Sequence, residues 1–539
     1  MTRAPSDRLV DPVPRDGWEA AEIGFACPER YNASSILFDN LDRGLADKTA
    51  VLCSAGDFTY GQLCARACAI GNALIGLGLR RGDRVLCFME DHGDHLAVVF
   101  GAIRAGFTPM LINTLSPDDL IRFYLEDGDA RVVFCDAAQR ARFGVEALAG
   151  LDVRRVVTAG AGAEGAESLD AFIAGQPEAL APADTGRDDM AFWMYSSGST
   201  GRPKGVVHLQ HDIAYTAEAY AKPILGLGPG DVCFSVPKLF FAYGFGNSAS
   251  FPFAVGATTL LLPERPTPER IFDLVAARRP TRFFALPTLY TALIKHEAAA
   301  RADFASVRTC VSAAEILSEE IFAAWKTRFG HEILEGLGST EVLHIYLSNR
   351  LDAKKLGSAG RRVPGYAIKL VGADGAEVPR GAEGVMWVRG DSNAPCYWNR
   401  PDKTAETMRD GWIVTGDRFV EDEDGFYVFK GRADDLVKVS GQWVYPLEVE
   451  LALANHPQVH ECAVLAVALP DRRTTLKAYV ALAPGAVPDD AMTAALQSFV
   501  KERLVPYKYP RIVAYLDALP KTGTGKIDRA RLKALPPEG

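Results

Sequence analysis

Residues 195–205 read Tyr-Ser-Ser-Gly-Ser-Thr-Gly-Arg-Pro-Lys-Gly, and they join two short apolar runs, 191–195 (AFWMY) and 205–208 (GVVH). The glycines open backbone conformations that other residues avoid, so successive N–H groups can point towards an anion. Four hydroxyls and the Lys204 ammonium add polar contacts. This is not the common P-loop, because Gly205 follows Lys204 and no helix is expected there. The segment predicts a phosphate-binding loop between two strands, although its composition alone also fits a flexible surface loop.

The sequence before this loop alternates between short apolar runs and longer segments of helical period, from residue 48 to residue 136. This βαβαβαβ pattern predicts a largely parallel sheet covered by helices, and hence an α/β fold. Residues 158–187 are rich in Ala, Gly, Pro and acidic side chains and predict a surface connection. After the loop, apolar runs at 257–262, 281–287, 309–315 and 331–336 predict a second α/β body, followed by a β-rich part that ends near residue 431.

The last hundred or so residues have the pattern of a small separate α+β domain. We place the boundary at the charged turn 431–435 (GRADD), which gives domains 1–433 and 434–539. The run 239–263 contains no charged residue and is long enough to span a bilayer. Because glycines and prolines interrupt it, we interpret this run as a buried strand-and-loop region.

Composition restricts the possible partners and compartment. The chain has 539 residues, with 59 Lys and Arg against 68 Asp and Glu, a formal net charge of −9. No basic stripe suited to nucleic acid or an anionic membrane is found, so small molecules are the expected partners. Ten scattered cysteines and an N-terminus without a signal-like apolar run predict reduced thiols in a cytoplasmic protein.

Five further motifs follow the loop in a characteristic order: SAAEIL at 312–317, GLGSTE at 336–341, TGD at 415–417, GRADDLVKVSGQWVYPLEVE at 431–450 and PKTGTGKIDR at 520–529. Together with 195–205 they resemble the signature of the adenylate-forming superfamily, which includes acyl-CoA and aryl-CoA synthetases, luciferases and peptide-synthetase adenylation domains. The resemblance implies a large N-terminal domain of two α/β subdomains and a β-rich subdomain, with a small mobile α+β C-terminal domain.

Shorter strings are similar to the benzoate-CoA and 4-hydroxybenzoate-CoA ligase group within that superfamily. They are ERYNAS at 29–34, KLFFAYGFGN at 238–247, GSTEVLHIYLSN at 338–349, VPGY at 363–366 and PYKYPR at 506–511. The implied reaction joins an aromatic carboxylic acid to coenzyme A. ATP and Mg²⁺ first convert the carboxylate into an aryl-adenylate, and the CoA thiol then displaces AMP. Preorganised cations are needed because a carboxylate must approach a phosphate anion.

The resemblance also assigns roles to individual residues. The loop would hold the β- and γ-phosphates, Thr340 the α-phosphate and Glu341 the Mg²⁺ ion, while Asp417 and Arg432 would hold the ribose. The loop residues concerned are Ser196, Ser197, Gly198, Ser199, Thr200, Gly201 and Lys204. Adenine would be bordered by Ala314, Glu315, Ile316 and Glu335. Two positions depart from the usual pattern, since Leu337 replaces an aromatic residue and Ala314 replaces glycine.

The C-terminal motifs imply a moving domain. Lys526 would reach the attacking carboxylate and the α-phosphate during adenylation, and Asp434 would be the hinge. After rotation of the small domain, Ser440 and Gly441 would line a tunnel for the CoA thiol. Acetylation of Lys526 by a lysine acetyltransferase, reversed by a deacetylase, would remove its charge and switch adenylation off.

The acid is expected to be aromatic. Amino-acid-activating relatives carry an Asp where this chain has Ala242, and a buried ammonium group without a counter-charge is strongly disfavoured. A flat apolar ring would be enclosed by Phe241, Ala242, Tyr243, Gly338, Leu343, His344 and Ile345. Benzoate is the first choice and 4-hydroxybenzoate the second, because Tyr243 or His344 could meet a para hydroxyl. A medium-chain fatty acyl-CoA synthetase and a non-catalytic nucleotide-binding relative stay as alternatives, and either a monomer or a homodimer is compatible with the sequence.

Overall fold

The computed structural model describes residues 19–196, 202–433, 437–439, 442–469, 474–505, 508–521 and 527–535. The chain folds into two compact units, residues 1–368 with 387–414 and residues 369–386 with 415–539. The second unit thus takes in strand segments that precede residue 433. The sequence-based boundary between residues 433 and 434 stays a prediction.

The first sheet has seven strands in the order β7-β6-β5-β3-β4-β8-β9. Every neighbouring pair is parallel except β8 and β9. Its central strands are buried runs, as expected where helices cover a parallel sheet. The bounds are β3 (Arg84–Phe88), β4 (Thr108–Leu111), β5 (Ala130–Asp136), β6 (Arg155–Ala159), β7 (Glu167–Ser168), β8 (Met190–Ser196) and β9 (Lys204–Leu209).

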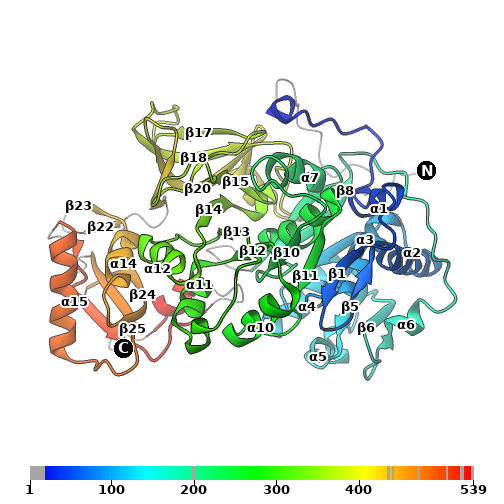
Figure 1. Ribbon diagram of the computed structural model, residues 1–539, viewed down its shortest axis with the longest axis horizontal. Coiled ribbons are helices and arrows are strands. Elements are labelled where there is room, and N and C mark those ends of the chain that lie inside the picture. Colours follow the sequence, from blue (N-terminus) through cyan, green and yellow to red (C-terminus); the bar gives the residue numbers. More distant parts are fainter. Residues whose placement is uncertain are drawn as a thin grey trace. The chain divides into compact units, whose positions relative to one another are not determined.

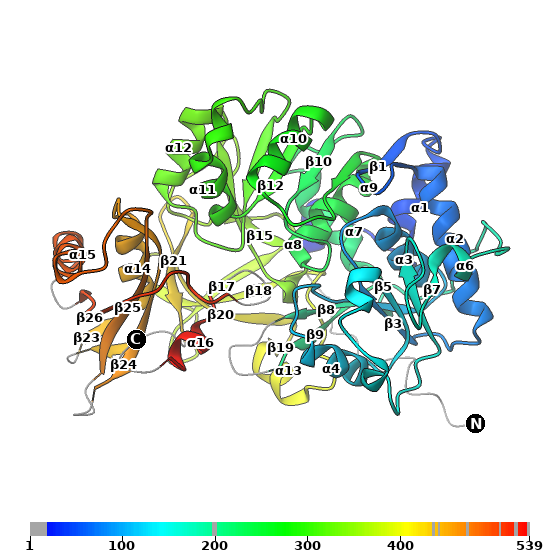
Figure 2. The ribbon, with the colours of Figure 1, turned by 90° about the horizontal axis from the view of Figure 1, so that it is seen from below.

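The second sheet has nine strands in the order β16-β15-β14-β13-β12-β10-β11-β1-β2. Trp325 and Phe283 stack within the core between this sheet and helices α10, α11 and α12, and Figure 2 shows these three helices together on one side of its strands. The strand bounds are β1 (Thr49–Cys53), β2 (Phe58–Thr59), β10 (Val232–Ser235), β11 (Thr258–Leu261), β12 (Arg282–Ala285), β13 (Thr309–Ser312), β14 (Ile333–Gly338), β15 (Ile345–Ser348) and β16 (Arg361–Arg362). The helix bounds are α10 (Pro268–Arg278), α11 (Pro287–Lys295) and α12 (Glu319–Phe329).

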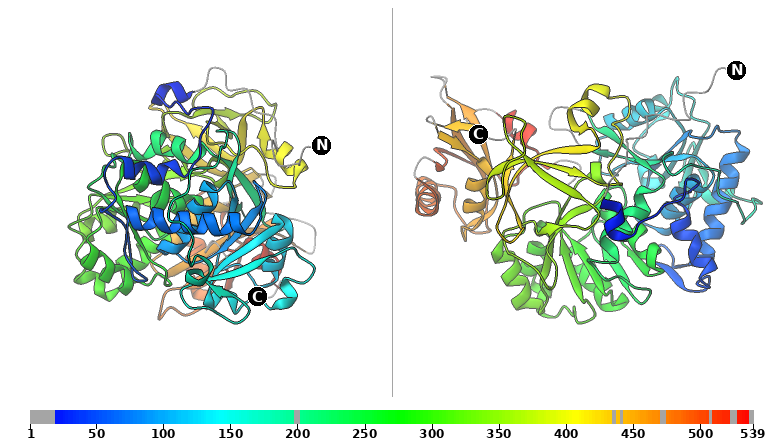
Figure 3. Two further views of the ribbon diagram at one scale, coloured as in Figure 1. Left: turned by 90° about the vertical axis from the view of Figure 1, so that its right-hand side faces the viewer. Right: turned by 90° about the horizontal axis from the view of Figure 1, so that it is seen from above.

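The helices α2 (Tyr60–Gly76) and α3 (Gly93–Arg104) lie side by side (Figure 3). Glycine allows this close packing, because a Cβ at Gly101 would lie 2.4 Å from the Ala67 carbonyl and one at Gly71 would lie 2.9 Å from the Gly101 carbonyl. The remaining helices of this part are α1 (Ser35–Asp42), α4 (Asp119–Gly128), α5 (Ala137–Arg140), α6 (Leu169–Phe172) and α7 (Asp212–Thr216). The predicted connection 158–187 therefore includes the short elements β7 and α6.

The interpretation of 239–263 as strand and loop is wrong for most of the run. It forms α8 (Ala242–Phe245), a π-helix η4 (Gly246–Ser250) and α9 (Phe251–Val255), and only β11 is a strand. Pro252 stands where the π-helix η4 passes directly into α9. The run lacks charge because most residues of these helices are buried. In the described part of the chain, no helix is both long and apolar enough to cross a membrane.

The C-terminal strands and helices agree with the predicted α+β pattern. Strands β24 (Val459–Ala468), β25 (Thr474–Leu482) and β26 (Ile512–Tyr515) form one sheet, in which β24 and β25 are antiparallel. Helices α14 (Pro446–Ala454) and α15 (Asp490–Arg503) pack on it (Figure 1), and α16 (Arg529–Lys533) follows β26. The β-rich part contains β17 (Ala367–Val371), β18 (Glu383–Arg389), β19 (Met408–Arg409), β20 (Trp412–Glu421) and β21 (Tyr427–Arg432), with α13 (Pro401–Thr407) before β19.

Candidate nucleotide and aryl-acid site

The predicted phosphate loop joins two antiparallel strands. Ser196 ends β8 and Lys204 begins β9, and the register pairs these two residues directly. Because β9 begins at Lys204, no helix begins after that residue, as the sequence predicted. Several predicted site residues lie outside the described residues, and these are Ser197, Gly198, Ser199, Thr200, Gly201, Asp434, Ser440, Gly441 and Lys526.

Glu341 lies beside the end of β8 and the start of β9, the two strand ends that the loop connects. Its Oε1 atom accepts hydrogen bonds from the Tyr397 hydroxyl at 2.8 Å and the Ser196 hydroxyl at 3.3 Å. The Lys204 ammonium stands 4.1 Å from the centre of the Tyr397 ring. The structure thus brings together Ser196, Lys204 and Glu341, which are up to 145 residues apart in sequence.

The turn that carries Glu341, η6 (Thr340–Val342), is held by its main chain. The Thr340 carbonyl lies 2.9 Å from His208 Nε2. The Glu341 carbonyl accepts from the Ala394 N–H at 2.8 Å, and the Val342 carbonyl accepts from the Ser392 hydroxyl at 2.8 Å. Three consecutive carbonyls are therefore anchored, so the side chains of Thr340 and Glu341 project from a fixed backbone.

The donor set at Glu341 fits Mg²⁺. The group offers one carboxylate with hydroxyl oxygens beside it, and no cluster of three or more His, Cys, Asp or Glu side chains suited to a metal occurs among the described residues. Mg²⁺ commonly binds through one or two carboxylates and completes its shell with substrate phosphates and water. Glu341 would therefore hold a magnesium ion that arrives with a nucleotide.

The residues predicted to border adenine follow the neighbouring strands β13 and β14. Glu335 pairs with Ser312 in the register of these strands, and residues 314–316 follow directly after β13. Ala314 has a φ of +72°, a conformation that favours glycine, which is the usual residue at this position of the motif. Glu315 accepts hydrogen bonds from the Thr288 N–H at 3.2 Å and hydroxyl at 2.6 Å. Ile316 is partly buried.

Glu335 has an unusual environment for a carboxyl group. It keeps some accessible surface, but protein surrounds most of it, and this desolvation raises its pKa to about 8. A hydrogen bond of 3.2 Å from the Leu317 N–H opposes the shift only partly. Glu335 is therefore largely protonated near neutral pH, and a neutral carboxyl can both donate and accept a hydrogen bond.

Asp417 and Arg432 belong to the second unit. They pair in the register of β20 and β21, and the Arg432 guanidinium donates to the Asp417 carboxylate at 3.2 Å. Arg432 also donates to the Thr415 carbonyl at 3.2 Å. The two residues predicted for the ribose thus contact each other.

The aryl residues come from α8 and from the segment after η6. The rings of Tyr243 and His344 have centroids 5.7 Å apart, and Phe251 stands 4.4 Å from His344. A Cβ at Gly246 would lie 2.2 Å from the His344 ring, so glycine is required there. Leu343, His344 and Ile345 are buried, as is Ala242, and Phe241 lies against Phe240. A Cβ at Gly338 would come within 2.5 Å of the His344 carbonyl.

The hydrogen-bonding capacity near these rings is only partly used. The Tyr243 hydroxyl donates to the Val311 carbonyl at 3.2 Å, and burial raises its pKa well above the usual range. Burial also lowers the pKa of His344 to about 3, against a small opposing effect of the Tyr243 backbone, so the ring is neutral. Among the described residues, no hydrogen bond of normal geometry reaches either ring nitrogen of His344 or the side-chain amide of buried Asn247.

Sequence reasoning did not select Tyr397, Asn247 or the residues that brace the loop. The Tyr195 hydroxyl donates to the Asp127 carboxylate at 3.0 Å, and Arg400 donates to the same carboxylate at 2.8 Å. Asp127 lies outside every recognised motif, so no signal could have found it. Asn247 ends the string 238–247 and was quoted there without a role.

Comparison with known proteins identifies the family. Residues 38–398 match the family model described as AMP-binding enzyme, and residues 448–526 match the AMP-binding enzyme C-terminal domain. The chain is 43% identical to a benzoate–CoA ligase of Thauera aromatica, over 94% of this chain and 96% of the relative. It is 39% identical to a 4-hydroxybenzoate–CoA/benzoate–CoA ligase of Rhodopseudomonas palustris, over 94% of each.

A solved structure of the anthranilate CoA ligase AuaEII in complex with anthranoyl-AMP has the same fold. Its TM-score is 0.89 at 36% identity, covering 94% of this chain and 98% of that one. The chain therefore belongs to the AMP-binding enzyme family and has the adenylate-forming enzyme fold. The fold class predicted from the motifs is confirmed.

Proposed function

We propose that this protein is an AMP-forming aromatic acid–CoA ligase, which converts benzoate or 4-hydroxybenzoate with ATP and CoA into aryl-CoA, AMP and diphosphate. The observation that carries the proposal is the convergence of Ser196, Lys204 and Glu341 where the phosphate loop joins β8 to β9. The activities named for the two relatives above support the aromatic acid.

The chain's own residues prepare the first half-reaction. Lys204 and the loop would bind the β- and γ-phosphates, Thr340 the α-phosphate and Glu341 a Mg²⁺ ion. Mg²⁺, when bound, offsets phosphate charge that would otherwise repel the attacking carboxylate. Because η6 is anchored through three carbonyls, these side chains would need little rearrangement. Glu335 with residues 314–316 would border adenine, and Asp417 with Arg432 would bind the ribose.

The C-terminal residues would complete the two steps. Lys526 would neutralise charge during adenylation, and Asp434 would be the hinge that then brings Ser440 and Gly441 to the CoA thiol. Acetylation of Lys526 would stop adenylation by removing its charge. The protein would act in the cytoplasm, as predicted from its ten scattered cysteines. Either a monomer or a homodimer fits this scheme, and the domain boundary would fall between residues 433 and 434.

The acid would lie among Phe241, Tyr243 and residues 343–345. Ala242 offers no counter-charge, which disfavours an amino acid as substrate. Benzoate remains the first choice. The unused capacity of His344 and Asn247 favours 4-hydroxybenzoate as a second substrate, since an acid with a ring hydroxyl would satisfy a buried polar group.

The test is pyrophosphate release by purified protein with ATP and Mg²⁺ across a panel of aryl and alkyl acids, with and without CoA. Release with benzoate or 4-hydroxybenzoate, and thioester only after CoA is added, is the expected result. Faster turnover of hexanoate than of every aryl acid would indicate a medium-chain fatty acyl-CoA synthetase. Nucleotide binding without pyrophosphate release from any acid would indicate a non-catalytic relative.

A further inference from the structure

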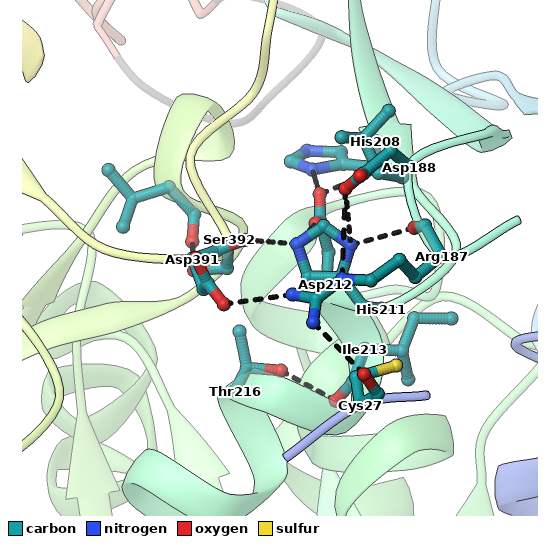
Figure 4. A network of polar contacts seen from close by, with 12 residues as sticks. Cys27, Arg187, Asp188, His208, His211, Asp212, Ile213, Thr216, Asp391 and Ser392 are labelled. Carbon is teal, nitrogen blue, oxygen red and sulfur yellow. Dashed lines mark hydrogen bonds and ion pairs between the residues drawn. The ribbon is translucent and has the colours of Figure 1, made fainter. Parts of the chain in front are cut away.

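A buried ionic network lies directly behind the turn that presents Glu341. It contains His208 from β9, His211 just before α7 and Asp212, the first residue of α7, and all three are fully buried. Figure 4 shows these side chains converging with Arg187, Asp188 and Asp391, although the residues come from three separate segments of the chain. A network of this kind is costly to bury unless its charges are balanced and its hydrogen bonds are made.

The geometry fixes the hydrogens on His208. Nδ1 lies 2.9 Å from Asp212 Oδ2, and Nε2 lies 2.9 Å from the Thr340 carbonyl. A carbonyl oxygen can only accept a hydrogen bond, so Nε2 must carry a hydrogen. Nδ1 then carries one too if Asp212 is ionised, whereas a protonated Asp212 would donate to a bare Nδ1.

His211 decides between these two states. Its Nδ1 lies 2.7 Å from the Arg187 carbonyl and its Nε2 lies 2.7 Å from the Asp391 carbonyl. Both partners are acceptors, so both nitrogens must carry a hydrogen and the ring is a cation. Its Nε2 also stands 3.3 Å from Asp212 Oδ1, a distance that favours an ionised carboxylate. His208 is then a cation as well.

The resulting charges balance. Three cations, His208, His211 and Arg187, face three carboxylates, and the carboxylates are Asp188, Asp212 and Asp391. The Asp212 carboxylate lies between the two imidazolium rings and also accepts from the Leu209 N–H at 3.0 Å. The His208 ring is fixed further by stacking on Phe192, with centroids 5.2 Å apart.

Both histidines act on the same turn. His208 binds the Thr340 carbonyl directly. His211 binds the Asp391 carbonyl, and the next residue, Ser392, holds the Val342 carbonyl. The network therefore anchors the first and last carbonyls of η6, those of Thr340 and Val342, on either side of Glu341.

We propose that His208 is a positioning residue for adenylation: as an imidazolium oriented by Asp212, it anchors the Thr340 carbonyl and so fixes the turn that presents Thr340 and Glu341 to the magnesium nucleotide. The proposal rests on the proposed function for its kinetic consequence. The protonation of the ring is a property of the protein alone.

The first experiment reads the ring without any substrate. Protein labelled with ¹⁵N in its 9 histidines gives long-range ¹H–¹⁵N spectra, and the His208 signals are those missing from His208→Gln. Two protonated nitrogens at His208 are expected in the ligand-free wild-type protein near neutral pH. A neutral ring with one bare nitrogen would overturn the proposal.

The second experiment separates positioning from a general loss of structure. His208→Ala should raise the KM for MgATP in pyrophosphate release and weaken MgATP binding measured by calorimetry without acid, each by about 10–100-fold. The KM for the acid and the reaction of supplied aryl-adenylate with CoA should change little. His208→Gln, which keeps a side-chain N–H, should recover part of the loss.

The chain offers a matched control. His92 is also buried against a carboxylate, with Nε2 2.8 Å from Asp136 Oδ1 at the end of β5, a strand separate from η6. His92→Gln should leave the MgATP constants within about twofold of wild type. Unchanged MgATP binding in His208→Ala, or equal effects in the two histidine variants, would overturn the anchor. Absence of turnover in the wild-type protein would instead refute the proposed function and leave the spectroscopic test intact.

Discussion

The nucleotide side and the aryl side of this protein use polar groups in opposite ways. Around Glu341, the hydroxyls of Ser196 and Tyr397 and the Thr340 carbonyl are paired, and an ionic network lies behind them. Around His344, buried polar atoms lie among aromatic rings with no hydrogen bond of normal geometry from the described residues. The polar groups of the first region are positioned before any substrate arrives, whereas the second region has hydrogen-bonding groups that a substrate could engage.

The difference has a physical reason. Adenylation involves the same phosphates in every turnover, so preorganised contacts to them stabilise the transition state for every acid. The aryl ring varies among family members, and a single hydrogen bond changes binding by only about 0.5–1.5 kcal/mol. We therefore expect large effects from changes on the nucleotide side and modest shifts in preference from changes on the aryl side.

The largest effect is expected for Lys526→Ala. Loss of one preorganised cation commonly costs about 10²–10³ in rate, so pyrophosphate release should collapse while supplied benzoyl-adenylate still reacts with CoA. Lys533→Ala on the exposed face of α16 is the control and should leave both half-reactions intact. Equal loss in both half-reactions would remove Lys526 from its assigned role.

A smaller effect on the same side is expected for Tyr397→Phe. The variant deletes the 2.8 Å hydrogen bond to the Glu341 carboxylate and keeps the ring beneath Lys204. A hydrogen bond to a charged group contributes about 1.5–3 kcal/mol, so pyrophosphate release at subsaturating MgATP should fall roughly 10–100-fold. Rates that match wild type at every MgATP concentration would show that Tyr397 does not position Glu341.

On the aryl side, Asn247→Leu should alter preference without loss of stability. The amide makes only a contact of poor geometry with the Tyr243 side chain, so its replacement removes a desolvation cost and the Tm should change little. The ratio of kcat/KM for 4-hydroxybenzoate over benzoate should fall about 2–10-fold.

Asn40→Leu is the contrasting control for that variant. Asn40 is equally buried, but its amide donates to the carbonyls of Ile36, Leu37 and Phe253. Leucine there removes these hydrogen bonds, including the one that joins α1 to the Phe253 carbonyl, so the Tm should fall while the acid preference stays the same. If the Asn247 variant is destabilised to the same extent, the Asn247 amide makes stabilising hydrogen bonds in the native protein.

The smallest expected effect concerns the pH dependence of stability at Glu335. Its folded pKa of about 8 lies above the ordinary 4.5, so the native state holds this proton more tightly than the unfolded chain. Its contribution to stability is fully present below about pH 4.5, is lost as pH rises to about 8, and then stays constant. Glutamine does not ionise, so Glu335→Gln does not lose this stability. Between about pH 4.5 and 8, the Tm of the variant minus that of wild type should therefore increase by roughly one to a few degrees. A pH-independent difference would show that Glu335 ionises normally.

Much of the fold could be predicted because its signals are local. The alternation between residues 48 and 136 gives the correct strands and helices apart from the short strand β2, because the apolar period distinguishes the longer elements. It could not assign β1 to the nine-stranded sheet beside β11, because strand pairing across about 200 residues leaves no local trace. The run 239–263 was misread because a helix that is mostly buried has no polar stripe to reveal its period.

The candidate site divides in the same way. Ser196, Lys204 and Glu341 stand in recognisable motifs, and the structure brings them together. Tyr397, Asn247 and His208 gained their roles only in three dimensions. The sequence also left open whether Tyr243 or His344 faces a ring hydroxyl, whereas the structure engages the Tyr243 hydroxyl with Val311 and gives the His344 nitrogens no hydrogen bond of normal geometry from the described residues.

By itself, the sequence determined the family, the order of the motifs and the types of chemical group, because these depend on residue identity and spacing along the chain. Only the tertiary structure decided which polar groups form hydrogen bonds with one another. The His208 side chain is the clearest case, since its partners are Asp212 on one side and a carbonyl 132 residues away on the other. Hydrogen bonding and desolvation depend on distance in space, and a linear sequence does not record that distance.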